Sequence, residues 1–169
     1  MIHAQIRKQF PAGSESAGFR LDLEFQAAEG VAILFGASGA GKTLTLDCIA
    51  GFVKPDEGRI LLDDRILFDA AAGVNRRPRE RQCGYVFQNY ALFPHMTLRQ
   101  NLAFAVERLP RHRRRQKVNE MVERFRLAEV AGRRPHELSG GQKQRCSIAR
   151  ALIGGGSGGP KILLLDEPA

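Results

Sequence analysis

The sequence predicts an α/β fold with an antiparallel β segment at its N-terminus. Short apolar runs at residues 31–35 and 162–165 have the composition of strands that are buried on both faces of a parallel sheet. Residues 19–25 alternate apolar and polar side chains instead, which is typical of a strand with one solvated face. Three helix-like stretches occupy much of residues 97–153. With 169 residues and 43% hydrophobic content, the chain can form one domain with its own core.

The N-terminal region is predicted to be an antiparallel sheet. Residues 2–6 and 19–25 both alternate with a period of two, and a loop rich in Pro, Gly and Ser separates them. Residues 59–62 and 65–68 flank a polar pair and predict a hairpin.

Between residues 31–35 and a helix-like segment lies a glycine-rich stretch with the spacing G-x-x-x-x-G-K-[ST]. Its glycines allow positive φ, so backbone N–H groups can converge on an anion. Lys42 would place a charge on the β and γ phosphates, and Thr43 would bind Mg²⁺. A helix over residues 43–50, ended by Gly51, would add its positive N-terminus. The alternative is a glycine-rich turn that matches by chance, which the flanking strand and helix disfavour. The predicted phosphate-binding residues are Gly36, Ala37, Ser38, Gly39, Ala40, Gly41, Lys42 and Thr43.

A further strand is predicted at residues 84–87, ending at Gln88, after which the pattern becomes helical. A capping box at Thr97 opens a helix that Pro110 would end, and a second helix is predicted at about residues 111–125.

Ser139 and Gln142 form another capping box, with two glycines in the first turn of a helix that runs to about Ile153. The glycines leave N–H groups open to a ligand. The pattern therefore fits an anion-binding helix N-terminus and a merely well-capped helix equally well.

The apolar run at residues 162–165 leads into Asp166 and Glu167. A carboxylate at the C-terminal end of a buried strand is where a sheet-based site holds its metal, so Asp166 suits Mg²⁺. Glu167 is then placed to orient or deprotonate a water molecule. Taken alone, the pair favours nothing more than a strand end.

The net charge of +8 suits nucleic acid, an anionic membrane surface or phosphate ligands without choosing among them. The basic runs at residues 76–81 and 111–117 contain no aromatic residue, so we expect solvated faces there. Cys48, Cys83 and Cys146 lie far apart, which argues against a zinc site or disulfides and indicates a reducing compartment. The sequence has no signal-like N-terminus and no apolar run near the roughly 20 residues that span a bilayer. We therefore expect a cytosolic or peripheral protein.

Four motifs stand in a familiar order: GASGAGKT at 36–43, Gln88 in YVFQ, LSGGQKQR at 138–145 and LLLDEP at 163–168. Together they resemble the ATP-binding subunits of ABC transporters over essentially the whole chain. The resemblance implies a P-loop NTPase of the ATP-binding-cassette type, with an N-terminal antiparallel β subdomain and an inserted helical subdomain. It also implies ATP and Mg²⁺ as cofactors. It further implies a dimer in which each site is closed by the partner's signature motif, which is LSGGQKQR in this sequence.

The resemblance assigns roles to individual positions. It implies phosphate binding at 36–43, a general base at Glu167, and Mg²⁺ and water sensing at Gln88. Thr43, Gln88 and Asp166 would be the metal ligands. The γ-phosphate of the ATP bound to the partner subunit would be contacted by Ser139, Gly140, Gly141 and Gln142. An aromatic residue would stack on adenine, for which Phe10 is preferred over Phe19.

Stretches such as GVAILFGASGAGKT and NYALFPHMTLRQNLAF resemble the ATPases of molybdate importers, with sulfate, sugar and polyamine importers as alternatives. This implies transmembrane permease subunits as partners, with Phe93, Pro94 and His95 as contacts. It also implies a peripheral position on the cytoplasmic face of the plasma membrane and no nucleic acid. Core packing is the alternative role of Phe93.

The family continues beyond the position of Ala169, through a switch histidine and further core strands. We therefore expect a partial cassette over 1–169 whose core lacks its C-terminal part and which self-associates and hydrolyses little ATP alone. Its core would comprise 1–88 and 154–169, and its helical subdomain 89–153. Alternatives from other classes are a soluble cassette ATPase acting on nucleic acid or the ribosome, and an inactive nucleotide-binding fragment.

Overall fold

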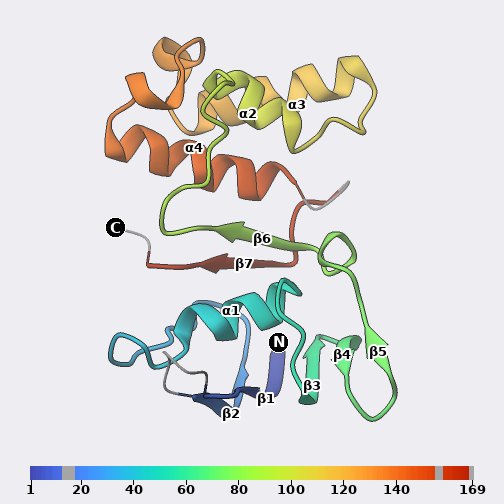
Figure 1. The fold of residues 1–169 in the computed structure, drawn as a ribbon. Coiled ribbons are helices and arrows are strands. Elements are labelled where there is room, and N and C mark those ends of the chain that lie inside the picture. Colours follow the sequence, from blue (N-terminus) through green and yellow to red (C-terminus); the bar gives the residue numbers. More distant parts are fainter. Residues whose placement is uncertain (13–17, 155–157, 168–169) are drawn as a thin grey trace. The chain divides into compact units, whose positions relative to one another are not determined.

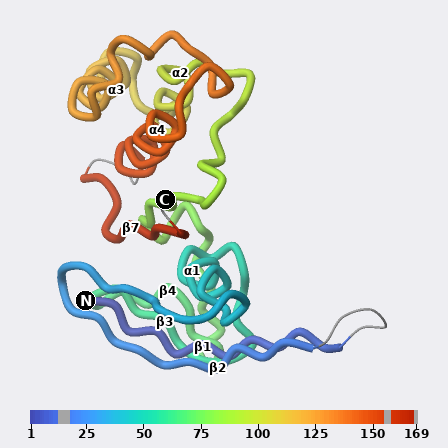
Figure 2. Tube along the Cα trace, turned by 90° about the vertical axis from the view of Figure 1, so that its left-hand side faces the viewer, coloured from blue at the N-terminus to red at the C-terminus, as the bar shows by residue number. Residues whose placement is uncertain are grey.

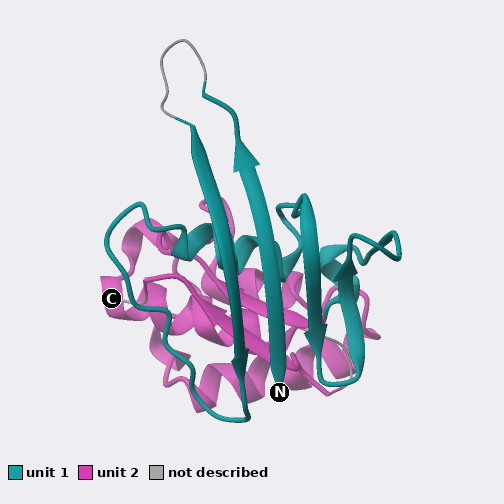
Figure 3. Cartoon of the chain, turned by 90° about the horizontal axis from the view of Figure 1, so that it is seen from below, with its two compact units in different colours: residues 1–81 teal, residues 82–169 magenta. Residues whose placement is uncertain are grey.

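A computed structural model describes residues 1–12, 18–154 and 158–167 (Figure 1). Parts of the loops predicted before residue 19 and after residue 153 lie outside the described residues. The chain divides into two units, Met1–Arg81 and Gln82–Ala169, which are coloured separately in Figure 3. The predicted division into a core and a helical subdomain, at residues 88 and 153, stays a prediction.

The first unit is built on an antiparallel sheet with the strand order β2-β1-β3-β4-β5. The two N-terminal strands lie side by side along their whole length (Figure 2). Phe10 pairs with Phe19 at one end of the ladder. This confirms the predicted antiparallel start. β3 and β4 also pair antiparallel, which confirms the predicted hairpin. The strands are β1 (Ile2–Phe10), β2 (Phe19–Ala27), β3 (Glu57–Leu62), β4 (Arg65–Asp69) and β5 (Val74–Asn75), followed by a 3-10 turn at Pro78–Glu80.

One helix, α1 (Lys42–Ala50), packs on this sheet, and its predicted bounds are confirmed within a residue. The alternating residues of β1 and β3 form the core beneath it, and Cys48 and Ile49 of α1 are buried with them. Burial raises the pKa of the Cys48 thiol to about 11, so this cysteine is an unreactive core residue. Gly51 ends the helix with φ of 87°, as the sequence predicts.

The strand predicted at residues 31–35 is wrong. The structure assigns no strand to these residues, and the side chains of Val31 and Phe35 are 93% and 99% exposed. The run has the composition of a buried strand, but a strand also needs a neighbour that accepts and donates its backbone hydrogen bonds. None of the described strands pairs with it.

Arg81 corrects the expectation that the basic run at residues 76–81 is a solvated face. Its side chain is fully buried. The guanidinium donates to the carbonyl oxygens of Cys48 (2.7 Å) and Ile49 (2.9 Å) at the end of α1. It also donates to the backbone oxygen of Arg76 and to Oδ1 of Asn75. Arg81 therefore ties the C-terminal end of α1 to the segment that follows β5, because a helix leaves its last carbonyls without partners inside the helix.

We predict that Arg81→Met lowers the free energy of unfolding by about 2 kcal/mol, because several buried carbonyl groups lose a charged donor. The matched control is Arg79→Met, an exposed arginine of the same basic run. Urea unfolding of both variants measures the effect. Equal midpoints would show that the buried guanidinium adds nothing to stability. A Cβ at Gly51 would come within 2.6 Å of Arg81 Nε, so Gly51→Ala should destabilise the same contact.

The described residues of the second unit form a parallel strand pair and three α-helices, whose arrangement can be followed in Figure 1. Strands β6 (Cys83–Val86) and β7 (Ile162–Leu165) lie in register, so both end at the same edge. The helices are α2 (Leu98–Phe104), α3 (Arg111–Arg124) and α4 (Gly140–Ile153), with 3-10 turns at Ala128–Val130 and Pro135–Glu137. Helix α2 ends earlier than Pro110. Leu165 is 41% exposed, so β7 is not buried throughout as the apolar run predicted.

The helices share an apolar core, and α4 also packs on β6. The buried residues of this apolar core include Leu98, Leu102, Val118, Val122, Cys146, Ala149 and Ile153. Both predicted capping boxes are confirmed, at Thr97 for α2 and at Ser139 for α4. No helix within the described residues has the length and hydrophobicity of a membrane span.

Candidate functional site

The glycine-rich loop precedes α1 directly, in the first unit. Gly39 and Gly41 have φ of 80° and 90°, the left-handed values that favour glycine. Residues 36–40 are exposed. The side chain of Lys42 folds back over this loop, and its Nζ donates to the carbonyl oxygens of Gly36 (2.9 Å) and Ala37 (3.0 Å). The ammonium group is thus held beside the loop at the positive end of α1, where an anion is favoured.

Gly41 is favoured by its backbone conformation, and it also lies close to two side chains of β2. A Cβ there would lie 2.8 Å from Cδ1 of Leu21 and 3.2 Å from Cζ of Phe19. Side chains of the sheet therefore lie against the base of the loop at Gly41. This is the backbone cradle that a triphosphate needs, so the residues fit the predicted ligand. Thr43, the second residue of α1, is exposed beside it.

Two aromatic residues, Phe10 and Phe19, pair at one end of the ladder formed by β1 and β2. Phe10 is 42% exposed, and Lys8 Nζ lies 5.5 Å from the centroid of its ring. Phe19 is half-buried and contacts the position of Gly41, as described above. Phe10 thus offers an accessible ring for stacking, whereas Phe19 serves the packing of the loop.

The second unit holds the other predicted catalytic residues at one edge. Gln88 follows β6, and Asp166 and Glu167 follow β7, so the parallel register brings them together. Gln88 Nε2 donates to Glu167 Oε2 at 2.7 Å. Asp166 is buried, with 6% of its surface exposed, and its N–H donates to the carbonyl oxygen of Val86. Glu167 is exposed and has φ of 44°.

These carboxylates could hold Mg²⁺ only together with a phosphate. Among the described residues no cluster of three or more His, Cys, Asp or Glu side chains could bind a metal. Nucleotide-bound Mg²⁺ uses one or two carboxylates, phosphate oxygens and water, so Asp166 fits that kind of site.

The N-terminus of α4 is capped from both sides. Ser139 Oγ accepts from the Gln142 N–H at 3.3 Å, and Gln142 Oε1 accepts from the Ser139 N–H at 2.9 Å. Ser139, Gly140 and Gly141 are exposed. A side chain added at Gly141 would meet no atom within 4 Å. The first turn is therefore uncrowded on the side of Gly141, whereas a Cβ at Gly140 would lie 3.8 Å from the Tyr90 hydroxyl.

The sequence did not indicate the role of Asn101, which is fully buried in α2. Its Oδ1 accepts from the Phe93 N–H at 2.8 Å, and its Nδ2 donates to the carbonyl oxygens of Phe93, Met96 and Thr97. Asn101 thereby holds the loop that contains the predicted permease contacts. Its place in the apolar stripe of α2, where an amide is unexpected, was the available signal.

The predicted contact residues differ in burial. Pro94 and His95 are exposed, whereas Phe93 is half-buried. The Phe93 ring packs edge-on against Phe104 at a centroid distance of 4.7 Å, and Arg150 lies over it at 5.5 Å. Phe93 therefore packs against partly exposed neighbours at the surface of the unit, so the choice between permease contact and core packing stays a prediction.

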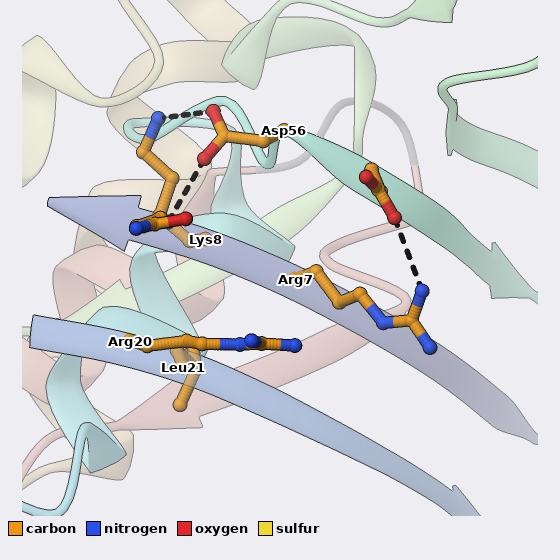
Figure 4. Close-up of a pocket in the computed structure, with 7 residues that line it drawn as sticks. Arg7, Lys8, Arg20, Leu21 and Asp56 are labelled. Atoms are coloured by element: carbon orange, nitrogen blue, oxygen red, sulfur yellow. Dashed lines mark hydrogen bonds and ion pairs between the residues drawn. The ribbon is translucent and has the colours of Figure 1, made fainter.

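A pocket of about 250 Å³ on the first unit is a separate feature (Figure 4). Its cations are all paired with carboxylates: Lys8 with Asp56 at 2.7 Å, and Arg7 and Arg20 with Asp22. The hydrogen bond from Lys8 holds the pKa of the Asp56 carboxyl below its ordinary value. The pocket is therefore neutral and does not suit a phosphate.

A glycine-rich loop at a helix N-terminus on an α/β framework is the arrangement that characterises the class of nucleoside-triphosphate-binding proteins. Within this class the chain belongs to the ABC transporter family, whose model matches residues 19–169. Similarity to a dimeric ATP-binding cassette, MJ0796, solved in a post-hydrolysis state bound to ADP and phosphate, confirms the predicted fold. The TM-score is 0.78 at 28% identity, covering 100% of this chain and 75% of that one.

Curated relatives include importer ATPases for different solutes. The molybdenum import ATP-binding protein ModC of Rhodospirillum rubrum is 47% identical over 154 residues, which are 91% of this chain and 40% of the relative. ModC of Pseudomonas syringae pv. tomato is 44% identical over an alignment that covers 99% of this chain and 44% of that protein. The trehalose/maltose import ATP-binding protein MalK of Thermococcus litoralis is 40% identical over an alignment that covers 92% of this chain and 41% of that protein. The chain thus spans less than half the length of these relatives.

Proposed function

We propose that the chain binds MgATP and hydrolyses it, as part of a cassette pair, to power a membrane importer. The observation that carries this proposal is the loop at Lys42, in which a glycine cradle and a lysine ammonium converge at the start of α1. The contact between Gln88 and Glu167 supports hydrolysis in addition to binding, because it pairs a polar amide with a base candidate.

In this proposal the residues at the edge of β6 and β7 act on the attacking water. Glu167 would accept a proton from that water, and Gln88 would orient the Glu167 carboxylate by its hydrogen bond. Thr43, Gln88 and Asp166 would hold Mg²⁺, which supplies charge stabilisation for phosphoryl transfer when bound. Residues Ser139 to Gln142 would close the site of the second subunit in a homodimer or paired cassette.

We further propose molybdate, or a related oxyanion, as the transported solute. Support comes from the identity of 47% and 44% to proteins named for molybdenum import. The trehalose/maltose relative, at 40% identity, keeps a sugar as the alternative. The proposed partners are transmembrane permease subunits, which would hold the chain peripherally on the cytoplasmic face of the plasma membrane.

Disrupting the gene in its host tests the solute. At nanomolar external molybdate, cellular molybdenum measured by mass spectrometry should fall, and excess molybdate should restore it. Growth on maltose or trehalose as sole carbon source is the second arm. Normal molybdenum content with lost growth on these sugars would contradict the molybdate proposal and support the alternative.

The proposed adenine platform can be tested by Phe10→Ala. We predict about tenfold weaker ATP binding, because base stacking on an aromatic ring contributes roughly 1–3 kcal/mol. Inorganic triphosphate has no base, so its affinity should change less than twofold. The matched control is Phe52→Ala, an exposed phenylalanine beyond α1 in the same unit. Equal ATP affinities in both variants would remove Phe10 from the site.

A further inference from the structure

The turn that follows Gln88 is strained. Tyr90 and Ala91 have φ of 62° and 45°, consecutive left-handed values that residues with a Cβ adopt at a cost. Two local hydrogen bonds support the turn: the Tyr90 N–H donates to the carbonyl oxygen of Phe87, and the Ala91 N–H donates to Asn89 Oδ1. Because the strain belongs to two non-glycine residues in sequence, contacts from outside the turn must stabilise it.

Helix α4 supplies those contacts. Ser147, which is fully buried, donates its hydroxyl to the carbonyl oxygen of Tyr90 at 3.0 Å. Arg150 donates to the same oxygen at 3.2 Å and to the carbonyl oxygen of Ala91 at 2.7 Å. The planar guanidinium thus holds two successive carbonyl groups, which a single ammonium group could not do with the same geometry.

The turn also reaches the start of α4. If Gly140 carried a Cβ, that atom would lie 3.8 Å from the Tyr90 hydroxyl. The tyrosine side chain therefore extends to the first turn of the helix. On its other side, the turn lies two residues after Gln88, whose amide donates to Glu167 at 2.7 Å. One short segment therefore approaches α4 at both its first turn and Arg150, and it follows directly on the residue that contacts Glu167.

We propose that Arg150 and Ser147 are positioning residues for Gln88. They hold Tyr90 and Ala91 in the left-handed conformation, and this sets the direction in which Gln88 leaves β6. The orientation of the Gln88 amide is thereby tied to α4. The inference rests on the proposed function, because it concerns how Gln88 is held ready to act with Glu167.

Hydrogen exchange of the nucleotide-free chain, followed by mass spectrometry, tests the positioning without requiring ATP binding. In Arg150→Lys, amides of the peptide covering residues 88–93 should exchange about tenfold faster than in wild type, since a two-pronged charged contact is lost. Arg145→Lys is the matched control, because it makes the same change at an exposed position of α4. Exchange at 88–93 that is equal in the two variants would overturn the proposal.

Two further variants keep the test decisive if Arg150→Lys loosens the whole unit. Ser147→Ala removes one hydrogen bond and should raise exchange at 88–93 about threefold, with the rest of Gln82–Ala169 unchanged. Ala91→Gly relieves one strained φ, so combining it with Arg150→Lys should restore part of the lost protection. A rise spread evenly over the unit in Ser147→Ala, with no rescue by glycine, would show a purely structural role.

A binding measurement connects the turn to the site. The quantity measured is the increase in ATP affinity when Mg²⁺ is added. In the Arg150→Lys variant this increase should be as small as in the Gln88→Ala variant. In the Arg145→Lys control it should equal the wild-type increase. An unchanged gain in Arg150→Lys would contradict the proposal. A wild-type chain that binds no ATP would refute the proposed function instead, and the exchange result would still decide the positioning role.

Discussion

Glu167→Gln is expected to lower the rate of ATP hydrolysis about a thousandfold while leaving ATP affinity within about twofold of wild type. A glutamine keeps an oxygen that can accept the Gln88 hydrogen bond of 2.7 Å, but it cannot take a proton from water. General-base removal costs roughly 10²–10⁴ in rate, so the loss should be seen in turnover and not in binding.

The curated relatives are more than twice as long as this chain, so the assay uses a chimera. In it, residues 1–169 replace the corresponding segment of the Rhodospirillum rubrum relative, and phosphate release is measured at saturating MgATP. Glu129→Gln is the matched control, because this glutamate is exposed on the second unit. The ATP-loaded Glu167→Gln chimera should also accumulate as a dimer on size-exclusion chromatography. Turnover equal to that of the control would show that Glu167 is not the base.

Lys42→Ala is expected to weaken ATP binding about a hundredfold or more. The ammonium group is held beside the loop by the carbonyl oxygens of Gly36 and Ala37, where it can reach phosphate oxygens. Losing a charge-assisted contact to phosphate costs a few kcal/mol. Stability should change by less than about 1 kcal/mol, because only two exposed hydrogen bonds within the loop disappear.

Titration of the purified chain with a fluorescent ATP analogue measures this effect, and thermal unfolding verifies the fold. Lys54→Ala, which removes an exposed lysine shortly after α1, should bind like wild type. If Lys42→Ala and Lys54→Ala bind ATP equally well, the glycine-rich loop is not the phosphate site.

Features set by neighbours along the chain could be predicted well. The capping boxes at Thr97 and Ser139, the left-handed Gly51 and the alternation of β1 and β2 each depend on residues a few positions apart. Such patterns act through the local backbone, so the sequence displays them directly. The spacing of the glycine-rich loop belongs to the same class, because one short segment forms the whole cradle.

Features that depend on distant partners could not be predicted from the pattern. Residues 31–35 have the right composition for a strand, yet no described strand pairs with them. Arg81 resembles the other arginines of its run, but only the carbonyl groups at the end of α1 explain why it is buried. The Gln88 contact with Glu167 joins residues far apart in sequence through the register of β6 and β7.

The sequence alone therefore determined the motifs from which the site is proposed: a glycine-rich loop before a helix, a capped glycine-containing helix and an acidic strand end. Only the tertiary structure decided which polar groups hold the surrounding backbone in place, among them the buried Arg81 and Asn101 and the partly buried Arg150. The physical reason is that a buried donor is stabilised by the acceptors around it. Those acceptors are mainly backbone carbonyl groups, which every residue has and which the amino-acid sequence therefore does not distinguish.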